Sequence, residues 1–338
     1  MPELENRKQT ILVTGGAGYI GSILLRRLLQ NDFKVICIDC LRYGGDALVE
    51  LWDDPNFNFQ KVDITNFIEV KNIFRNHKVD GIVHLAAIVG DPACKLEPEL
   101  ARKINLDASM NLMDCAIRFN IPRFIFASTC SNYGKMADAD GFVDENSPLN
   151  PISLYAELKV LFENYLLSKG KNVSGFSPTV LRFSTVYGIS PRMRFDLTIN
   201  EFTKELALGR ELDVYGEDYW RPYCHVRDFS QAILAVLNSK QDQVANNVFN
   251  IGDSSQNYTK KMIVNELLKL LPNSQVRYVH VGEDPRDYRV NFEKIKHTLG
   301  FTSSRTVPEG MFDILTCIQQ RVFANPDEQR YYNIPVSR

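Results

Sequence analysis

Two polar side chains four residues apart are the first candidates for catalysis in this sequence, Tyr155 and Lys159 of the segment YAELK. Residues i and i+4 lie on one face of a helix, so the Lys159 ammonium is expected beside the Tyr155 phenol. A neighbouring positive charge favours the phenolate, which makes tyrosine a usable base near neutral pH. Such a pair alone is also common on solvated helix faces, so its meaning depends on the segments around it.

A second polar group, STCSNYG from Ser128 to Gly134, directly follows an apolar run from Arg123 to Ala127. The run is predicted to be a strand. Ligands bind at the carboxyl ends of strands in open α/β sheets. A hydroxyl in this segment can therefore share a hydrogen bond with Tyr155 and a substrate alcohol.

Three glycines with G-x-x-G-x-x-G spacing, Gly15, Gly18 and Gly21, join the β-branched run Thr10 to Thr14 to a helical segment. Glycines let the backbone approach a pyrophosphate, which the amides and dipole of the helix N-terminus then stabilise. The strand–glycine–helix order predicts a dinucleotide site. The alternative is a tight turn between strand and helix that binds no ligand.

Two acidic residues bear on the identity of the dinucleotide. Asp39 ends the second predicted strand, where it can accept hydrogen bonds from both adenosine ribose hydroxyls and would repel a 2′-phosphate. Asp63 ends the third predicted strand and is placed to meet the adenine amine. These residues favour NAD over NADP. Arg42 is the counter-argument, because a nearby arginine can accommodate a 2′-phosphate.

The elements that must position these residues alternate along the first half of the chain. Repeated β-α-β order implies an α/β fold, a Rossmann-type doubly wound parallel sheet. The predicted strands are Thr10 to Thr14, Lys34 to Ile38, Asn58 to Val62, Gly81 to Leu85, Arg123 to Ala127 and Thr179 to Phe183. The predicted helices include Ile20 to Gln30, Asn66 to Asn76, Pro98 to Asn120 and Pro151 to Lys169.

The alternation of strand and helix changes at about Tyr187. The remaining elements are predicted to form a smaller C-terminal α+β lobe, interleaved with returns to the main sheet. We expect a NAD-binding domain over residues 1–186, with returns near 222–254, and a mainly substrate-binding lobe over 187–338.

Composition excludes several classes of function. The 338 residues carry a formal charge of −2, which leaves no basic surplus for nucleic acid. No apolar run approaches the roughly 18 residues of a membrane span, and the polar N-terminus suggests a cytoplasmic protein. The seven cysteines are spread widely, and Cys37 and Cys40 are interpreted as packed thiols, so no metal site is predicted.

Taken together, the motifs resemble the extended short-chain dehydrogenase/reductase family, specifically its NAD-dependent nucleotide-sugar epimerases and dehydratases. The matching stretches follow the family's order from about residue 10 to residue 300. They are TGGAGYIGS at Thr14 to Ser22, HLAA at His84 to Ala87, STCSNYG, YAELK, RPYCHVRD at Arg221 to Asp228, NIGD at Asn250 to Asp253 and NYT at Asn257 to Thr259.

The resemblance implies roles for the matching positions. Tyr155 would be the catalytic base, Thr129 would take the family's Ser/Thr position, Lys159 would hold the nicotinamide ribose, and Asn105 would be structural. The residues expected to bind NAD are Gly15, Gly18, Tyr19, Ile20, Gly21, Asp39, Arg42, Asp63, Ile64, Leu85, Ala86, Ala87, Tyr155 and Lys159. The residues expected to bind substrate are Thr129, Arg192, Arg194, Arg221, Arg286 and Arg289; surface charge is the alternative for Arg192 and Arg194.

One departure from the family's pattern concerns the residues after Thr129. The dehydratases of the family place Asp-Glu there, whereas this chain has Cys130 and Ser131. A 4,6-dehydratase is therefore disfavoured. A Cys130 thiolate is a further catalytic candidate, as a base for epimerisation beside a ketone, and simple packing beneath the nicotinamide is the alternative.

The function implied is NAD-dependent oxidation at C4 of a nucleoside-diphosphate sugar through a 4-keto intermediate, as in a 4-epimerase. A 4-dehydrogenase or 4-keto reductase of a deoxysugar or heptose pathway is the alternative among enzymes. A non-catalytic NAD(H)-binding regulator is the alternative from another class. The resemblance also implies a homodimer that pairs the two long helices at Pro98 to Asn120 and Pro151 to Lys169.

Overall fold

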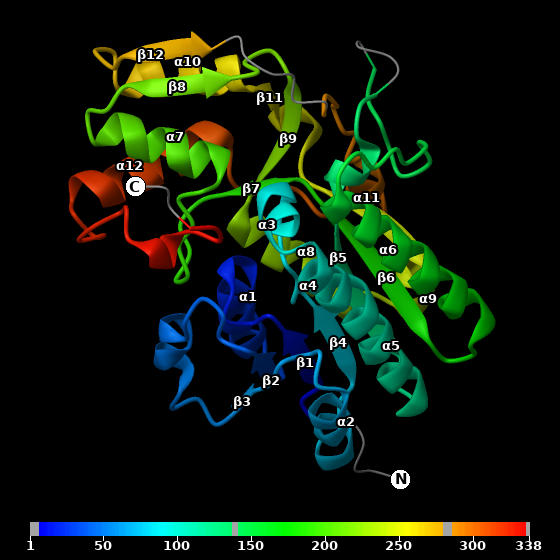
Figure 1. Ribbon diagram of the computed structural model, residues 1–338. Coiled ribbons are helices and arrows are strands. Elements are labelled where there is room, and N and C mark those ends of the chain that lie inside the picture. The colour runs from blue at the N-terminus through cyan, green and yellow to red at the C-terminus, as the bar shows by residue number, and fades with distance from the viewer. Residues whose placement is uncertain (1–6, 137–140, 280–285, 336–338) are drawn as a thin grey trace.

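A seven-stranded, fully parallel sheet forms the centre of the chain, for which the computed structural model describes residues 7–136, 141–279 and 286–335 (Figure 1). Its order, β3-β2-β1-β4-β5-β6-β10, reverses direction between β1 and β4, which is where open α/β sheets bind ligands. The predicted fold class is confirmed. The strands are β1 (Thr10–Thr14), β2 (Lys34–Asp39), β3 (Phe57–Lys61), β4 (Gly81–His84), β5 (Arg123–Thr129), β6 (Ser177–Phe183) and β10 (Asn247–Ile251).

Helices cover both faces of this sheet because its strands are apolar on both faces. Successive residues of β1 alternate between faces: Ile11 and Val13 lie in one buried cluster and Leu12 in the other. The helices of the first cluster are α1 (Tyr19–Gln30) and α8 (Val226–Asn238), and those of the second are α2 (Phe67–Asn76), α5 (Ser109–Arg118) and α6 (Leu154–Asn172).

The single helix predicted from Pro98 to Asn120 is interrupted. It begins as α4 (Pro98–Arg102), continues through a π-helical segment, Lys103–Ala108, and ends as α5. Within the π-helical segment the Asn105 side chain donates to the Ile88 carbonyl at 2.9 Å and accepts from the Ile88 amide at 2.8 Å. The irregular turn therefore fastens the loop that follows β4, and π-bulges are frequent at functional sites.

The second long helix, α6, starts and ends later than predicted. It begins at Leu154, where the Ser153 side chain accepts a hydrogen bond from the Ala156 amide at 3.3 Å, and not at Pro151. It also continues past Gly170 to Asn172. Gly170 does not end the helix, because it is a site of close packing: a Cβ there would lie 1.9 Å from the Asn246 Oδ1 atom.

The C-terminal part builds a lobe with its own buried cluster and returns α8 and β10 to the main body (Figure 1). A two-stranded and a three-stranded sheet support it, and three of its helices pack together. These elements are β7 (Thr185–Tyr187), β8 (Leu212–Tyr215), β9 (Trp220–His225), β11 (Asn257–Thr259), β12 (Val276–Val279), α7 (Thr198–Ala207), α10 (Lys260–Leu270) and α12 (Val307–Gln319).

Shorter helical elements complete the described chain: α3 (Asp91–Leu96), α9 (Gln241–Val244) and α11 (Glu293–Leu299). Among residues 7–136, 141–279 and 286–335, no helix is long and apolar enough to span a membrane.

Candidate active site

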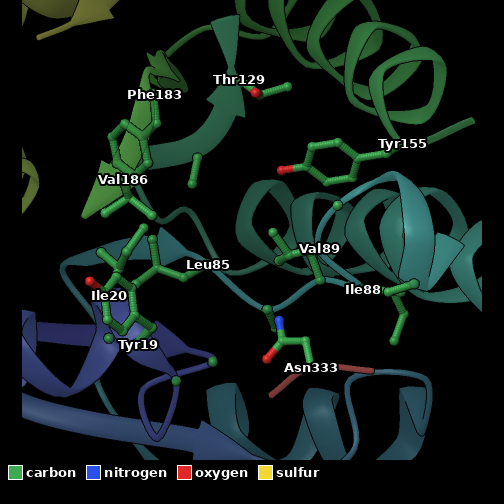
Figure 2. A pocket seen from close by; sticks show the side chains of 18 of the residues that line it. Tyr19, Ile20, Leu85, Ile88, Val89, Thr129, Tyr155, Phe183, Val186 and Asn333 are labelled. Carbon is green, nitrogen blue, oxygen red and sulfur yellow. The ribbon is translucent and has the colours of Figure 1, made fainter. Parts of the chain in front are cut away.

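A cavity of about 420 Å³ lies between the main sheet and the C-terminal lobe. Figure 2 shows side chains from both parts of the chain around it: Leu85 and Phe183 follow or end strands of the main sheet, and Val186 and Asn333 come from the C-terminal part. Every residue predicted to bind NAD lines this cavity: Gly15, Gly18, Tyr19, Ile20, Gly21, Asp39, Arg42, Asp63, Ile64, Leu85, Ala86, Ala87, Tyr155 and Lys159.

The glycine turn between β1 and α1 is too tightly packed for larger residues. Gly15 has φ +73°, and a Cβ there would lie 2.7 Å from the Ala86 amide nitrogen. A Cβ on Gly21 would lie 2.3 Å from the Gly15 carbonyl oxygen. The N-cap of α1, Gly18, supplies no side-chain cap, so the amides of the first turn are left for an anionic ligand at the cavity.

The Asp39 carboxylate is held at the end of β2 by two backbone amides. Its Oδ2 atom accepts from Ala17 at 3.0 Å, and its Oδ1 atom accepts from Leu41 at 2.8 Å. Burial raises the pKa of Asp39 above its ordinary value. Arg42 pairs with Glu97, so this arginine already has an anionic partner. The geometry fits a ribose diol, and Arg42 is not reserved for a 2′-phosphate.

Tyr155 lies in the first turn of α6, and its hydroxyl points into the cavity on the side of Thr129 (Figure 2). The start of this helix is tied to the start of α3, because the Ser153 hydroxyl donates to the Asp91 Oδ1 atom at 2.6 Å. Asp91 also pairs with Arg286 at 2.9 Å. The position of Tyr155 is thus set jointly by the helix cap and a carboxylate at the cavity wall.

Lys159 also lines the cavity and is buried, one helical turn after Tyr155. Its Nζ atom donates to the Ala127 carbonyl at 2.7 Å and lies 5.8 Å from the centre of the Tyr155 ring. Burial lowers the pKa of Lys159 to about 7 and raises the pKa of Tyr155 above its ordinary value. This differs from the expectation that Lys159 by itself favours the phenolate, because desolvation is the largest influence on both groups.

Thr129 and Cys130 have opposite surroundings although they are adjacent. Thr129, the last residue of β5, lines the cavity, and its Oγ1 atom accepts from the Ser131 amide at 3.1 Å. Cys130 is fully buried away from the cavity lining, and its thiol donates to the Arg182 carbonyl at 3.2 Å. Burial raises the pKa of Cys130 well above its ordinary value. The structure does not bring this thiol to the reacting groups.

The five candidate substrate arginines separate into two sets. Arg192, Arg194 and Arg286 line the cavity. Arg221 and Arg289 do not: Arg221 lies over the Tyr288 ring, with its guanidinium carbon 5.3 Å from the ring centre, and Arg289 packs on the Phe142 and Trp220 rings.

The cavity also takes in residues that the sequence motifs did not single out. Tyr43, Asp196 and Asn333 come from a loop after β2, the segment before α7 and the C-terminal segment. The Asn333 amide donates to the Asp196 Oδ2 atom at 3.0 Å. No spacing rule predicts such contacts, since they join segments far apart in the sequence.

Comparison with known proteins agrees with this geometry. The sequence model of the NAD dependent epimerase/dehydratase family matches residues 11–252. The structure is similar to that of a UDP-glucose 4-epimerase from Thermotoga maritima, solved with UDP-glucose, with TM-score 0.83 and 28% identity, covering 93% of this chain and 100% of the other.

Two further relatives show the range of reactions in the family. A UDP-glucuronic acid 4-epimerase from Bacillus cereus, solved with UDP-glucuronic acid and NAD, has TM-score 0.81 and 25% identity, covering 92% of this chain and 99% of the other. A dTDP-glucose 4,6-dehydratase from Neisseria gonorrhoeae is 28% identical over 332 residues, covering 90% of this chain and 94% of the other. The predicted cofactor, NAD, is confirmed, and this chain belongs to the NAD dependent epimerase/dehydratase family.

Proposed function

We propose that this protein is a sugar-nucleotide 4-epimerase, which oxidises C4 of a nucleoside-diphosphate sugar through a 4-keto intermediate. The observation that carries the proposal is that Tyr155, Thr129 and the buried Lys159 all line one cavity. A tyrosine in this position can take the proton of a sugar hydroxyl while Thr129 shares the hydrogen bond.

NAD supplies the acceptor and later the donor of the C4 hydride. The chain's own residues carry out the proton transfer. The Tyr155 phenol must lose its proton to act as base, and because burial raises its pKa, a nearby positive charge would have to offset that effect. Rotation of the 4-keto sugar and reduction from its other face then invert C4, with Tyr155 returning the proton.

The surroundings of the acidic groups favour epimerisation over dehydration. A 4,6-dehydratase needs an acid for the C6 hydroxyl and a base for the C5 proton. Cys130 is a buried thiol with a raised pKa. Asp91 is held by Ser153 and Arg286, and Asp196 is held by Arg194. Each of these groups already has a partner within the protein. We therefore propose oxidation and reduction at C4 alone, without elimination of water.

The proposal is tested by incubating the enzyme, NAD and a panel of nucleotide sugars in deuterated water, followed by NMR. Inversion at C4 with no deuterium on carbon is the expected result. Deuterium at C3 or C5 of an epimer would mean that a base acts beside the ketone. A 6-deoxy-4-keto product would mean that this is a dehydratase whose carboxylates come from elsewhere.

The same panel separates the remaining alternatives. Net formation of NADH with release of a 4-keto sugar would identify a dehydrogenase, and NADH consumption with a 4-keto sugar would identify a reductase. Binding of NAD(H) with no turnover on any sugar would favour a regulator. Tyr155→Phe is the matched control, because it removes the base and keeps the ring.

A further inference from the structure

Arg192 is a buried cation in the wall of the cavity. The residue is 6% exposed, and its Nε and Nη2 atoms have no hydrogen-bond partner among the residues that the structure describes. Its guanidinium carbon lies 4.5 Å from the centre of the Tyr43 ring, a stacking contact that holds the group in place without satisfying its donors.

The other two arginines of the cavity have carboxylate partners. The Nε and Nη2 atoms of Arg194 donate to the two carboxylate oxygens of Asp196, each at 2.9 Å, and Arg286 pairs with Asp91 at 2.9 Å. A buried charge without such a partner is costly, and burial lowers the pKa of Arg192 to about 10. The uncompensated donors of Arg192 therefore indicate an anionic ligand.

The neighbours of Arg192 indicate which part of the cavity this anion occupies. Tyr43 follows Asp39 in the loop after β2, and both line the cavity. The segment that carries Arg192 contacts the first turn of α1, because the Ser190 hydroxyl, two residues before Arg192, donates to the Tyr19 carbonyl at 2.7 Å. Arg192 thus lies near both the expected ribose site and the N-terminus of α1.

We propose that Arg192 binds the pyrophosphate of NAD from the side of the C-terminal lobe, opposite the amides of α1. A guanidinium is suited to this because its planar donors match phosphate oxygens in pairs. The contact links the lobe to the dinucleotide domain through the cofactor. It depends on the NAD site and not on the proposed sugar chemistry.

The test is calorimetry on protein stripped of cofactor, comparing wild type with Arg192→Met and Arg192→Lys. NAD and ADP, which carry the diphosphate, are expected to bind Arg192→Met at least tenfold more weakly. Adenosine, which carries none, is expected to bind all three within twofold. Arg192→Lys restores part of the affinity, because it keeps the charge and loses the paired donors. The matched control is Arg277→Met, a surface arginine of the same lobe paired with Asp213.

Thermal unfolding without cofactor supplies a second readout. Arg192→Met is expected to unfold at the same temperature as wild type or higher, because it removes an unpaired buried charge. If Arg192→Met does not fold, Arg192→Gln gives the same comparison of ADP with adenosine.

Three outcomes would overturn the proposal. Equal loss of adenosine and ADP affinity would make Arg192 a residue that only supports the cavity. Loss of UDP affinity with unchanged NAD affinity would assign it to the diphosphate of the substrate. Unchanged affinity for every probe would mean that Arg192 binds none of these anions. All of these are binding measurements, so failure of the 4-epimerase proposal would not alter them.

Discussion

The hydroxyl of Tyr155 is the single group on which the proposed chemistry depends. Tyr155→Phe is expected to lower kcat by roughly 10²–10⁴, because a positioned acid/base contributes that much. NAD affinity should change less than twofold, since the ring stays at the cavity wall. Steady-state kinetics and calorimetry on the same preparation measure the two effects. Wild-type turnover by Tyr155→Phe would rule out this base.

Another prediction at the scale of single residues concerns His84, which is 1% exposed at the end of β4. Its two ring nitrogens lie 2.7 Å from the Thr14 hydroxyl and 2.8 Å from the Ser109 hydroxyl, and burial lowers its pKa to about 3. The unfolded chain therefore binds a proton below about pH 6.5 that the folded chain does not. His84 contributes a loss of stability as the pH falls from about 6.5 towards 3.

The effect of His84 is measured from urea unfolding at a series of pH values. His84→Asn is expected to reduce the slope of the unfolding free energy below pH 6 by up to about 1.4 kcal/mol per pH unit. His225, whose pKa burial also lowers to about 3, supplies a residual slope of the same sign. His297→Gln, at a surface histidine, is the control. Equal slopes for His84→Asn and wild type would contradict the assignment.

Among the elements, α6 carries both catalytic candidates, and its far end is fixed by close packing. A Cβ on Gly170 would lie 1.9 Å from the Asn246 Oδ1 atom and 2.5 Å from the Pro178 ring. In an open helix, Gly→Ala stabilises by roughly 0.5–1 kcal/mol. Gly170→Ala is instead expected to destabilise by about 1–3 kcal/mol, the cost of overpacking.

Chemical denaturation of Gly170→Ala beside Lys171→Ala, the exposed neighbour in the same helix, measures this cost. A stabilised Gly170→Ala would mean that Pro178 and Asn246 move aside without strain.

The π-helical segment shows a related effect at another element. Local propensity predicts a regular helix there, and the two hydrogen bonds between Asn105 and Ile88 accompany the departure from it.

For the whole molecule we propose a homodimer formed through α5 and α6, which lie side by side on one face of the sheet (Figure 1). Their apolar side chains Leu112 and Phe162 are already buried against the strands. A dimer must therefore use the opposite face, where Leu161 is 50% exposed. Light scattering at micromolar concentration is expected to give twice the mass of one chain, and Leu161→Glu to give a monomer. A monomeric wild type would contradict the proposal.

The sequence by itself determined the sheet, the cofactor and the family. Each of these rests on contacts between residues close in the chain: the glycine turn before α1, Asp39 at the end of β2, and Tyr155 and Lys159 one helical turn apart. Alternation of strand and helix also leaves few topologies, because parallel crossovers have a fixed hand. Local spacing together with the resemblance to the family named the predicted NAD residues, and all of them line one cavity.

Only the tertiary structure decided which polar groups reach that cavity and how their pKa values are shifted. Thr129 and Cys130 are adjacent, yet one lines the cavity and the other is buried beside Arg182, because successive residues at the end of a strand point to opposite sides. Three of the five candidate arginines reach the cavity, and among them, within the described residues, Arg192 alone has no hydrogen-bonded carboxylate partner. Desolvation, which sets the pKa values of Tyr155 and Lys159, depends on everything packed around a group, and no spacing in the sequence records it.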